Sequence, residues 1–236
     1  MSFIIAIHVQ EGLVLASDSR TTYNSTVSND GKETKQLGVH ITDTTYKTFL
    51  TPTNVGISTC GNASINNKPI AGFIEDFIIL HKEDDVEAIV KAINPYFNSI
   101  APSLDTDFIV GGYTNKENGE QVQKLYQVKT ANNSVEEINT STQGAIWDGE
   151  TSILSRLIND VYLKSEKEDK YIPFVHYDIL WNYLTLQDAV DFARYAVQTT
   201  INTMRFQKRV KTVGGPIDIL VIKPNESRWI SRKELQ

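Results

Sequence analysis

The chain has 236 residues, of which 40% are hydrophobic and 22% charged, which is ordinary for a globular protein large enough to bury a substantial core. Its formal net charge of −6 argues against a general nucleic-acid binder, because contacts with phosphates need a basic surface. The single cysteine cannot form an internal disulfide, and no apolar run has the length of a membrane span or the form of a signal peptide, so we expect a cytoplasmic protein without membrane contacts.

Strands dominate the first quarter of the predicted structure. The turn residues Glu11-Gly12 separate two short apolar runs, which is typical of a hairpin. The polar stretch 21–36 contains Asn29-Asp30-Gly31 and indicates a long loop or the exposed tip of a hairpin. Four strands are expected, at 3–9, 13–17, 39–50 and 55–60.

Helical patterns appear in two later blocks. Apolar residues recur there at spacings of three and four, which is typical of amphipathic helices. Pro95 is expected to kink or split one helix, and Thr185 followed by Asp188 resembles a capping box. We expect helices at 62–81, 86–100, 149–161 and 185–204, and strands at 107–113, 121–128 and 217–222. Because strands and helices fall in separate blocks, we predict an α+β fold of one domain (1–236), with a pair of sheets covered by helices.

The residue after the initiator methionine is a candidate nucleophile. If Met1 is removed, Ser2 carries both a hydroxyl oxygen and a free α-amine, whose ordinary pKa of about 7.7–8.0 suits a base near neutral pH. Such a unit also needs a cation that keeps the amine neutral, a carboxylate that holds the cation, and a backbone N–H for the oxyanion. The candidates for these roles are Lys47, Asp18 and Gly61.

Several motifs resemble those of proteasome β-type subunits and their bacterial relatives. The segment Ala16-Ser17-Asp18-Ser19-Arg20 is similar to the family's Ala-X-Asp-X-Arg motif. The spacing from Lys47 to Gly61 is similar to that between the family's active-site lysine and oxyanion glycine. Other segments are similar to the central hairpin and the closing strand, at 107–113, 124–128 and 214–218. Within this superfamily the chain most resembles the ancestral bacterial proteasome-like (Anbu) proteins, through the segments 17–21 and 147–150.

The resemblance implies a fold, an activity and an assembly. The fold is the four-layer αββα arrangement of N-terminal nucleophile (Ntn) hydrolases, which cleave peptide or amide bonds without a cofactor. Ser2 is the implied nucleophile, Lys47 lowers its pKa, Asp18 orients Lys47, and the Gly61 N–H binds the oxyanion. The implied assembly is a ring-like or spiral homo-oligomer that encloses the sites and takes peptide or protein substrates. Whether an ATP-dependent unfoldase feeds it stays open.

The chain departs from the family pattern in the second half of the site. The nucleophile is serine rather than the more usual threonine, and Glu150 stands where a serine is expected. Glu150 is either a replacement carboxylate in the site or an acidic residue at a helix N-terminus. The late Asp and Ser of the family fall at Val210 and Val213. These substitutions put efficient proteolysis in doubt more than they question the fold.

Two functional alternatives come from other classes. The missing late Asp and Ser favour a catalytically silent scaffold subunit, and a small-amide amidase of the wider Ntn superfamily is the other alternative. Within the site, Lys32 or Lys35 competes with Lys47 as the cation, because the stretch from Asp18 to Lys47 is longer than in the family. We favour Lys47, whose distance to Gly61 matches.

Cys60 offers a further reading as the nucleophile of a cysteine protease, with His40 or His81 as its base. We favour a buried strand cysteine, because a free cysteine packs as a small hydrophobe. The four histidines show no spacing typical of metal ligands, so the sequence predicts no metal site.

Overall fold

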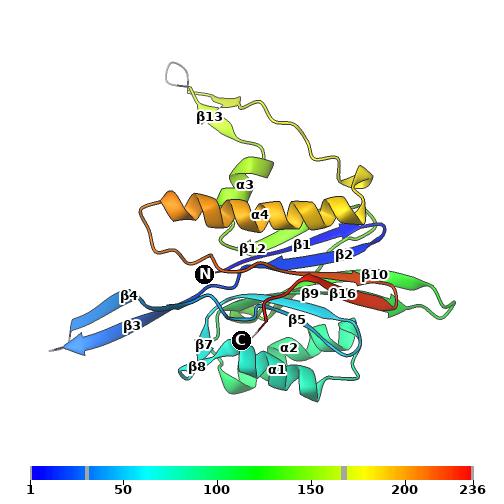
Figure 1. Cartoon of the computed structure of the whole chain (residues 1–236), viewed down its shortest axis with the longest axis horizontal. Coiled ribbons are helices and arrows are strands. Elements are labelled where there is room, and N and C mark those ends of the chain that lie inside the picture. Colours follow the sequence, from blue (N-terminus) through cyan, green and yellow to red (C-terminus); the bar gives the residue numbers. More distant parts are fainter. Residues whose placement is uncertain (1, 30–31, 166–168, 235–236) are drawn as a thin grey trace.

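The computed structural model describes residues 2–29, 32–165 and 169–234 (Figure 1). Within these residues, two five-stranded antiparallel sheets pack against each other, and helices cover their outer faces. The fold is therefore mixed α and β, built around several sheets. No helix in these ranges combines the length and the hydropathy that crossing a membrane requires.

The strands form two large sheets and three small ribbons. The order in the first sheet is β12 (Gly144–Gly149), β1 (Phe3–Val9), β2 (Gly12–Ser17), β15 (Asp218–Lys223) and β16 (Glu226–Ser231). The order in the second is β11 (Ser134–Glu137), β10 (Gln121–Lys129), β9 (Thr106–Asn115), β6 (Gly56–Gly61) and β5 (Thr48–Leu50). The ribbons pair β3 (Thr21–Asn29) with β4 (Lys32–Thr42), β7 (Ser64–Ile65) with β8 (Lys68–Pro69), and β13 (Tyr162–Lys164) with β14 (Tyr171–Pro173).

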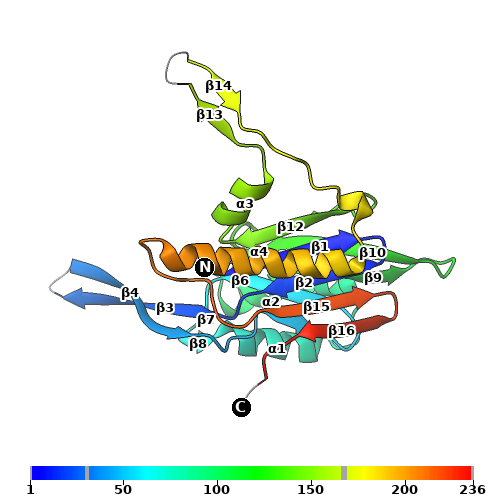
Figure 2. The same ribbon diagram turned by 45° about the horizontal axis from the view of Figure 1, so that its top comes forward.

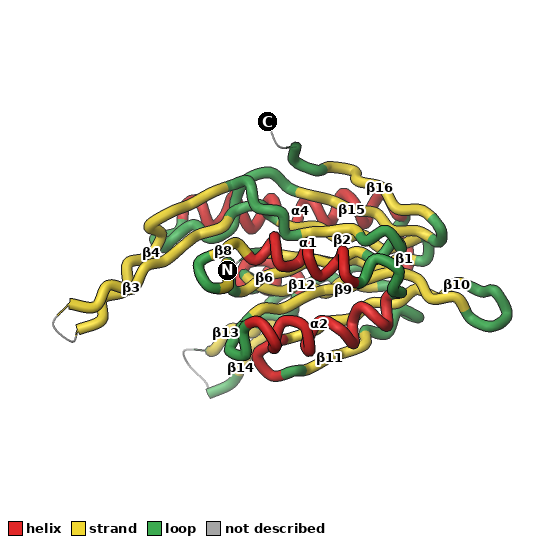
Figure 3. The backbone as a smooth tube through the Cα atoms, turned by 90° about the horizontal axis from the view of Figure 1, so that it is seen from below, coloured by secondary structure: helices red, strands yellow, loops and turns green. Residues whose placement is uncertain are grey.

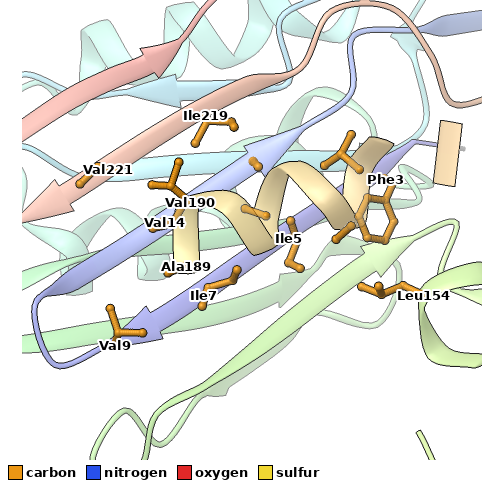
Figure 4. Close-up of a cluster of buried hydrophobic side chains, with 14 of the residues drawn as sticks. Phe3, Ile5, Ile7, Val9, Val14, Leu154, Ala189, Val190, Ile219 and Val221 are labelled. Carbon is orange, nitrogen blue, oxygen red and sulfur yellow. The ribbon is translucent and has the colours of Figure 1, made fainter. Parts of the chain in front are cut away.

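Strand β1 contributes to two separate cores. Successive side chains of a strand point to opposite faces, and every residue of β1 is buried, so both faces are covered. Phe3, Ile5, Ile7 and Val9 pack against helix α4 (Leu186–Phe206), and Leu154 of α3 (Ser152–Ile158) joins them (Figure 4). The alternate residues Ile4 and Ala6 face the second sheet. Because β1 is held on both sides, the residue that precedes it is held as well.

Helices α1 (Ile70–Leu80) and α2 (Val86–Ile100) cover the outer face of the second sheet (Figure 3). Their apolar side chains, such as Ile74, Phe77 and Ile93, pack on Phe108 and Val128 of that sheet. The Asp85 carboxylate accepts a hydrogen bond from the Ala88 N–H and so begins α2 with an N-cap.

The predicted elements are largely confirmed. The hairpins β1–β2 and β9–β10 form as expected. Helix α2 has the predicted bounds and continues through Pro95, which does not split it. The Thr185–Asp188 capping box begins α4. Strand β15 is buried on both faces, as its apolar run predicts.

Some expected elements differ in the structure. The helix predicted over 62–81 begins only at Ile70, because Asn66 and Asn67 adopt positive φ values of 49° and 62° and close the β7–β8 ribbon. The predicted strand 39–50 is interrupted, since β4 ends at Thr42 and β5 begins at Thr48. The predicted helix 149–161 is shorter, because Gly149 ends β12 and α3 covers only Ser152–Ile158. Strands β11, β12, β13, β14 and β16 were not expected.

The polar stretch 21–36 forms an extended hairpin rather than a loop. Strands β3 and β4 pair from Thr21 opposite Thr42 to Asn29 opposite Lys32, and the ribbon projects away from the sheets (Figures 1 and 2). Residues 30–31 of the predicted turn lie outside the described residues. This ribbon accounts for the long stretch between Asp18 and Lys47.

Candidate functional site

Asp18 follows the end of β2 and is completely buried. Its Oδ1 accepts hydrogen bonds from the Phe3 N–H (3.0 Å) and from Lys47 Nζ (2.8 Å). Its Oδ2 accepts from the N–H groups of Arg20 (3.0 Å) and Gly214 (2.9 Å). The carboxylate is therefore fixed by four donors from separate parts of the chain, and it in turn holds the ammonium of Lys47 in one place.

Lys47 lies just before β5 and is only 3% exposed. Its ammonium also donates a hydrogen bond to the Arg20 carbonyl. Burial lowers the pKa of Lys47 from its ordinary value, although the charge and the hydrogen bond of Asp18 oppose that shift. A cation with so little water around it interacts strongly with any anion that forms beside it.

Ser2 is buried at the N-terminal end of β1, where its backbone is clamped by the end of β12. The Ser2 carbonyl accepts a hydrogen bond of 2.7 Å from the Glu150 N–H. Gly149 has a φ of +86°, and a Cβ at this position would lie 2.0 Å from the Ser2 carbonyl oxygen. Only glycine fits there, because both the conformation and the close approach exclude a side chain.

Gly61 ends β6 and closely approaches the backbone just before β9. Its φ is +112°, and a Cβ there would lie 2.4 Å from the Asp105 carbonyl oxygen. The Asp105 carbonyl also accepts a hydrogen bond of 2.9 Å from the Asn62 N–H, which fixes the chain after Gly61. This position too requires glycine.

A cavity of about 270 Å³ brings these residues into one site. Ser2, Lys47 and Gly61 all lie in its wall, together with Arg20 and the hydroxyl residue Thr59. The predicted nucleophile, cation and oxyanion donor thus line one partly open cavity, and Asp18 holds Lys47 from outside it. A hydroxyl, a buried cation and a tight glycine turn in one cavity suit acyl transfer.

Glu150 does not turn its carboxylate toward this cavity. Oε2 accepts a hydrogen bond of 2.7 Å from Arg209 Nη1, and Oε1 accepts one from the Ser152 hydroxyl. Burial alone would raise the pKa of Glu150, but the hydrogen bonds from Ser152 and Arg209 outweigh it and the pKa is lowered. Glu150 therefore contacts Ser2 through its backbone N–H, and its side chain stabilises the start of α3 and Arg209.

The remaining residues named from the sequence lie elsewhere. Val213 is buried in the core beneath α4, and Val210 is partly buried. The ring of His40 stacks on that of Tyr23, with 5.8 Å between the ring centroids. His81 Nδ1 lies 2.7 Å from an Asp84 carboxylate oxygen. Within the described residues these contacts do not bring either histidine to Cys60, so the geometry does not support a cysteine protease. The side chains of the alternative cations, Lys32 and Lys35, lie outside the described residues.

Arg20 is a further residue of the cavity wall. Its guanidinium donates two hydrogen bonds, of 2.6 and 2.7 Å, to the carboxylate of Asp43. Gly214 lies directly against it, and a Cβ on Gly214 would be 2.6 Å from Arg20 Cζ. A side chain on Gly214 would therefore have to displace this guanidinium from its contact with Asp43.

A polar cluster that begins at the cavity wall, where Cys60 lies, could not be read from the sequence. Cys60 Sγ and carboxylate oxygens of Asp107 and Asp148 all lie within 4.8 Å of one another. Burial raises the pKa of the Cys60 thiol well above its ordinary value. Burial and the neighbouring Asp148 raise the pKa of Asp107 to about 6. The only sequence signal is that Cys60 precedes Gly61 and Asp148 precedes Gly149, and nothing in that signal joins the two.

Comparison with known proteins identifies the fold. No protein-family model and no curated protein matches the sequence. A solved structure described as an Anbu (Gly-1) mutant from Hyphomicrobium sp. strain MC1 matches with a TM-score of 0.62 and 18% sequence identity, over 98% of this chain and 87% of that chain. At this identity the likeness concerns the fold alone.

Proposed function

Starting from a proteasome-like fold, we propose that the chain is an Ntn hydrolase that cleaves peptide or amide bonds, with Ser2 as the nucleophile after removal of Met1. The observation that carries the proposal is the cavity whose wall contains Ser2, Lys47 and Gly61. The buried ion pair of Asp18 and Lys47 also supports it. Burying charged groups costs free energy, and a role in the site is a reason for the chain to keep the pair at this position. The proposal includes a single domain (1–236) with the four-layer αββα arrangement, and a cytoplasmic location.

In the proposed mechanism, Ser2 Oγ attacks the amide carbonyl carbon. The Ser2 amine, acting through a water molecule, takes the hydroxyl proton and passes it to the leaving amine. The Gly61 N–H binds the oxyanion of the tetrahedral intermediate, and Lys47 stabilises the negative charge on Oγ during attack. Collapse of the intermediate releases the amine and leaves an ester on Ser2. Attack by water on that ester releases the acid and restores the hydroxyl.

Two measurements test this function together. Mass spectrometry of the purified protein is expected to show that Met1 is absent. A panel of peptides and a panel of small amides, each assayed with the wild type and with Ser2→Ala, should show hydrolysis only by the wild type. Ser2→Thr is the conservative control and should retain activity, because it keeps the hydroxyl and the amine. Retention of Met1, or full activity in Ser2→Ala, would contradict the mechanism.

The second candidate is a catalytically silent scaffold subunit. It is favoured by the positions of Glu150 and Val213, since the carboxylate of Glu150 is engaged by Arg209 and Val213 packs in the core. Inactivity of a wild type that has lost Met1 would favour this candidate. Hydrolysis of small amides without hydrolysis of peptides would favour a small-amide amidase, which the modest cavity volume of about 270 Å³ also suits.

We further propose that the chain forms a ring-like or spiral homo-oligomer. The support is an arm of the molecule, β13–β14 with the chain that follows it, which extends away from the sheets (Figure 2). It exposes large apolar side chains, including Leu163, Ile172, Phe174 and Tyr177. Exposed apolar surface of this kind is typical of protein interfaces.

A further inference from the structure

The cluster of Cys60, Asp107 and Asp148 joins the two large sheets at the end that carries the cavity. Cys60 on β6 and Asp107 on β9 are directly paired neighbours in the second sheet. Asp148 comes from β12, at the edge of the first sheet. One sulfur and two carboxylate groups thus converge within 4.8 Å from three strands and both sheets.

The Cys60 thiol points into this cluster without a hydrogen-bond partner among the described residues. The residue is only 4% exposed, so water does not replace the missing partner freely. Sulfur packs well in an apolar site, but here it lies beside two carboxylates rather than among hydrocarbons alone. A ligand that binds sulfur and oxygen together would satisfy all three groups.

Asp148 is oriented for such a ligand by neighbouring donors. Its Oδ1 accepts a hydrogen bond of 2.6 Å from the Gly149 N–H, and its Oδ2 accepts one of 2.6 Å from Gln127 Nε2. Each carboxylate oxygen keeps a further lone pair for a ligand. Hydrogen bonds of this type fix the orientation of carboxylates that bind metal ions.

The charges of the cluster match a divalent cation. Once the thiol has lost its proton on binding, the thiolate and two carboxylates carry three negative charges, and Lys129 Nζ, at 3.9 Å from Asp107 and 3.6 Å from Asp148, offsets one of them. Lys129 is 39% exposed at its side chain and can turn toward solvent. The Asp107 and Asp148 side chains, at 22% and 14% exposed, leave a path by which an ion can enter.

We propose that Cys60, Asp107 and Asp148 form a binding site for a thiophilic divalent cation of the Zn²⁺ class. A sulfur donor selects Zn²⁺ over Mg²⁺ and Ca²⁺, and three protein ligands leave a fourth position for water. Binding forms a sulfur–metal bond and releases the thiol proton to solvent. The ion ties β6 and β9 to β12 immediately before Gly61 and Gly149, so its role is to stabilise the two glycine turns of the site. It takes no part in the proposed hydrolysis.

The experiment uses Cd²⁺ as a spectroscopic probe of the full-length protein. Cd²⁺ bound to a thiolate gives a charge-transfer band in the ultraviolet, and Cys60 is the only cysteine, so any such band reports on this site. We expect the band to saturate at one equivalent of Cd²⁺ and to be displaced by Zn²⁺ but not by Mg²⁺. Cys60→Ser should abolish it. Asp107→Asn and Asp148→Asn should each weaken binding by at least about tenfold.

Matched variants separate this site from adventitious binding and from the proposed activity. Asp84→Asn removes a carboxylate beside His81, away from the cluster, and should leave the affinity unchanged. Ser2→Ala should also bind Cd²⁺ normally, because the site does not use the nucleophile. A folded wild type without the band at one equivalent would overturn the proposal. Unchanged Cd²⁺ affinities in both Asp107→Asn and Asp148→Asn would also overturn it. These two variants retain the thiol, so they test the site even if Cys60→Ser fails to fold.

Discussion

At the scale of single residues, the site depends on how each buried charge is compensated. The negative charge of Asp18 is compensated by Lys47 and by three backbone N–H groups. The fold fixes the positions of these donors, and they in turn fix the carboxylate. Lys47 has fewer partners and is almost fully buried, which lowers its pKa. The carboxylate is thus fixed firmly, while the lysine stays sensitive to a negative charge that forms in the cavity.

Glu150 provides a residue-scale prediction about pH. Its folded pKa is lowered from the ordinary value of 4.5, so the folded state binds this proton less readily than the unfolded state does. The stabilisation from Glu150 is therefore present above pH 4.5 and is lost as the pH falls through the lowered folded value. Melting temperatures measured between neutral and acidic pH should fall less steeply for Glu150→Gln than for the wild type. Arg209→Gln removes the guanidinium that binds Glu150 and should likewise make the melting temperature less dependent on pH. Equally steep pH dependence in all three proteins would refute the role given to Glu150.

At the scale of elements, the two glycine turns determine how strands meet at the cavity. Gly149 lets β12 approach the start of β1, and Gly61 lets β6 approach the chain before β9. In each case a Cβ would collide with a backbone carbonyl oxygen rather than with a flexible side chain. The elements therefore cannot adjust by changing a rotamer, and the positions of Ser2 and Gly61 depend on these turns.

Gly149→Ala and Gly119→Ala form a matched pair that tests this dependence. Both glycines have positive φ, +86° and +82°, but a Cβ on Gly119 meets no atom within 4 Å. Gly119→Ala should therefore cost only the conformational strain, about 1–2 kcal/mol in the free energy of unfolding. Gly149→Ala adds the collision with the Ser2 carbonyl and should cost clearly more and also abolish hydrolysis. Denaturant unfolding and the peptide assay measure the two effects, and equal losses for both variants would contradict the role of Gly149.

At the scale of the whole molecule, two ribbons project from the packed sheets. The β3–β4 hairpin and the β13–β14 arm both extend into solvent in the isolated chain (Figures 1 and 2). A two-stranded ribbon is only marginally stable by itself. A partner that covers the ribbon would stabilise it and would account for its exposed apolar side chains. This connects the shape of the chain with the proposed homo-oligomer.

A paired substitution on the arm tests the assembly. Leu163 and Ile172 are cross-strand neighbours that are 54% and 46% exposed. Replacing both with serine should reduce the mass of the particle measured by light scattering, because an interface loses apolar contacts that the isolated chain does not make. Circular dichroism should stay unchanged, since the sheets and their cores do not include these residues. A particle of unchanged mass would exclude the arm from the interface.

The sequence by itself determined the elements whose signals are local. The mainly apolar runs of β1 and β2, the capping box of α4 and the periodicity of α2 predict those elements correctly. The helix predicted over 62–81 was wrong in its first part, because Ile65, Pro69 and Phe73 keep a helical spacing of four across a turn made by Asn66 and Asn67. A short apolar pattern cannot distinguish these two conformations.

Only the tertiary structure decided which distant groups meet. The motif pattern named Ser2, Asp18, Lys47 and Gly61 as one unit, and the fold places all of them in or directly behind one cavity. The motif pattern could not show that the Glu150 carboxylate binds Arg209, 59 residues away, or that Cys60 lies beside Asp107 and Asp148. Periodicity and capping act over a few neighbouring residues, whereas these contacts depend on how two sheets pack, which no local pattern specifies.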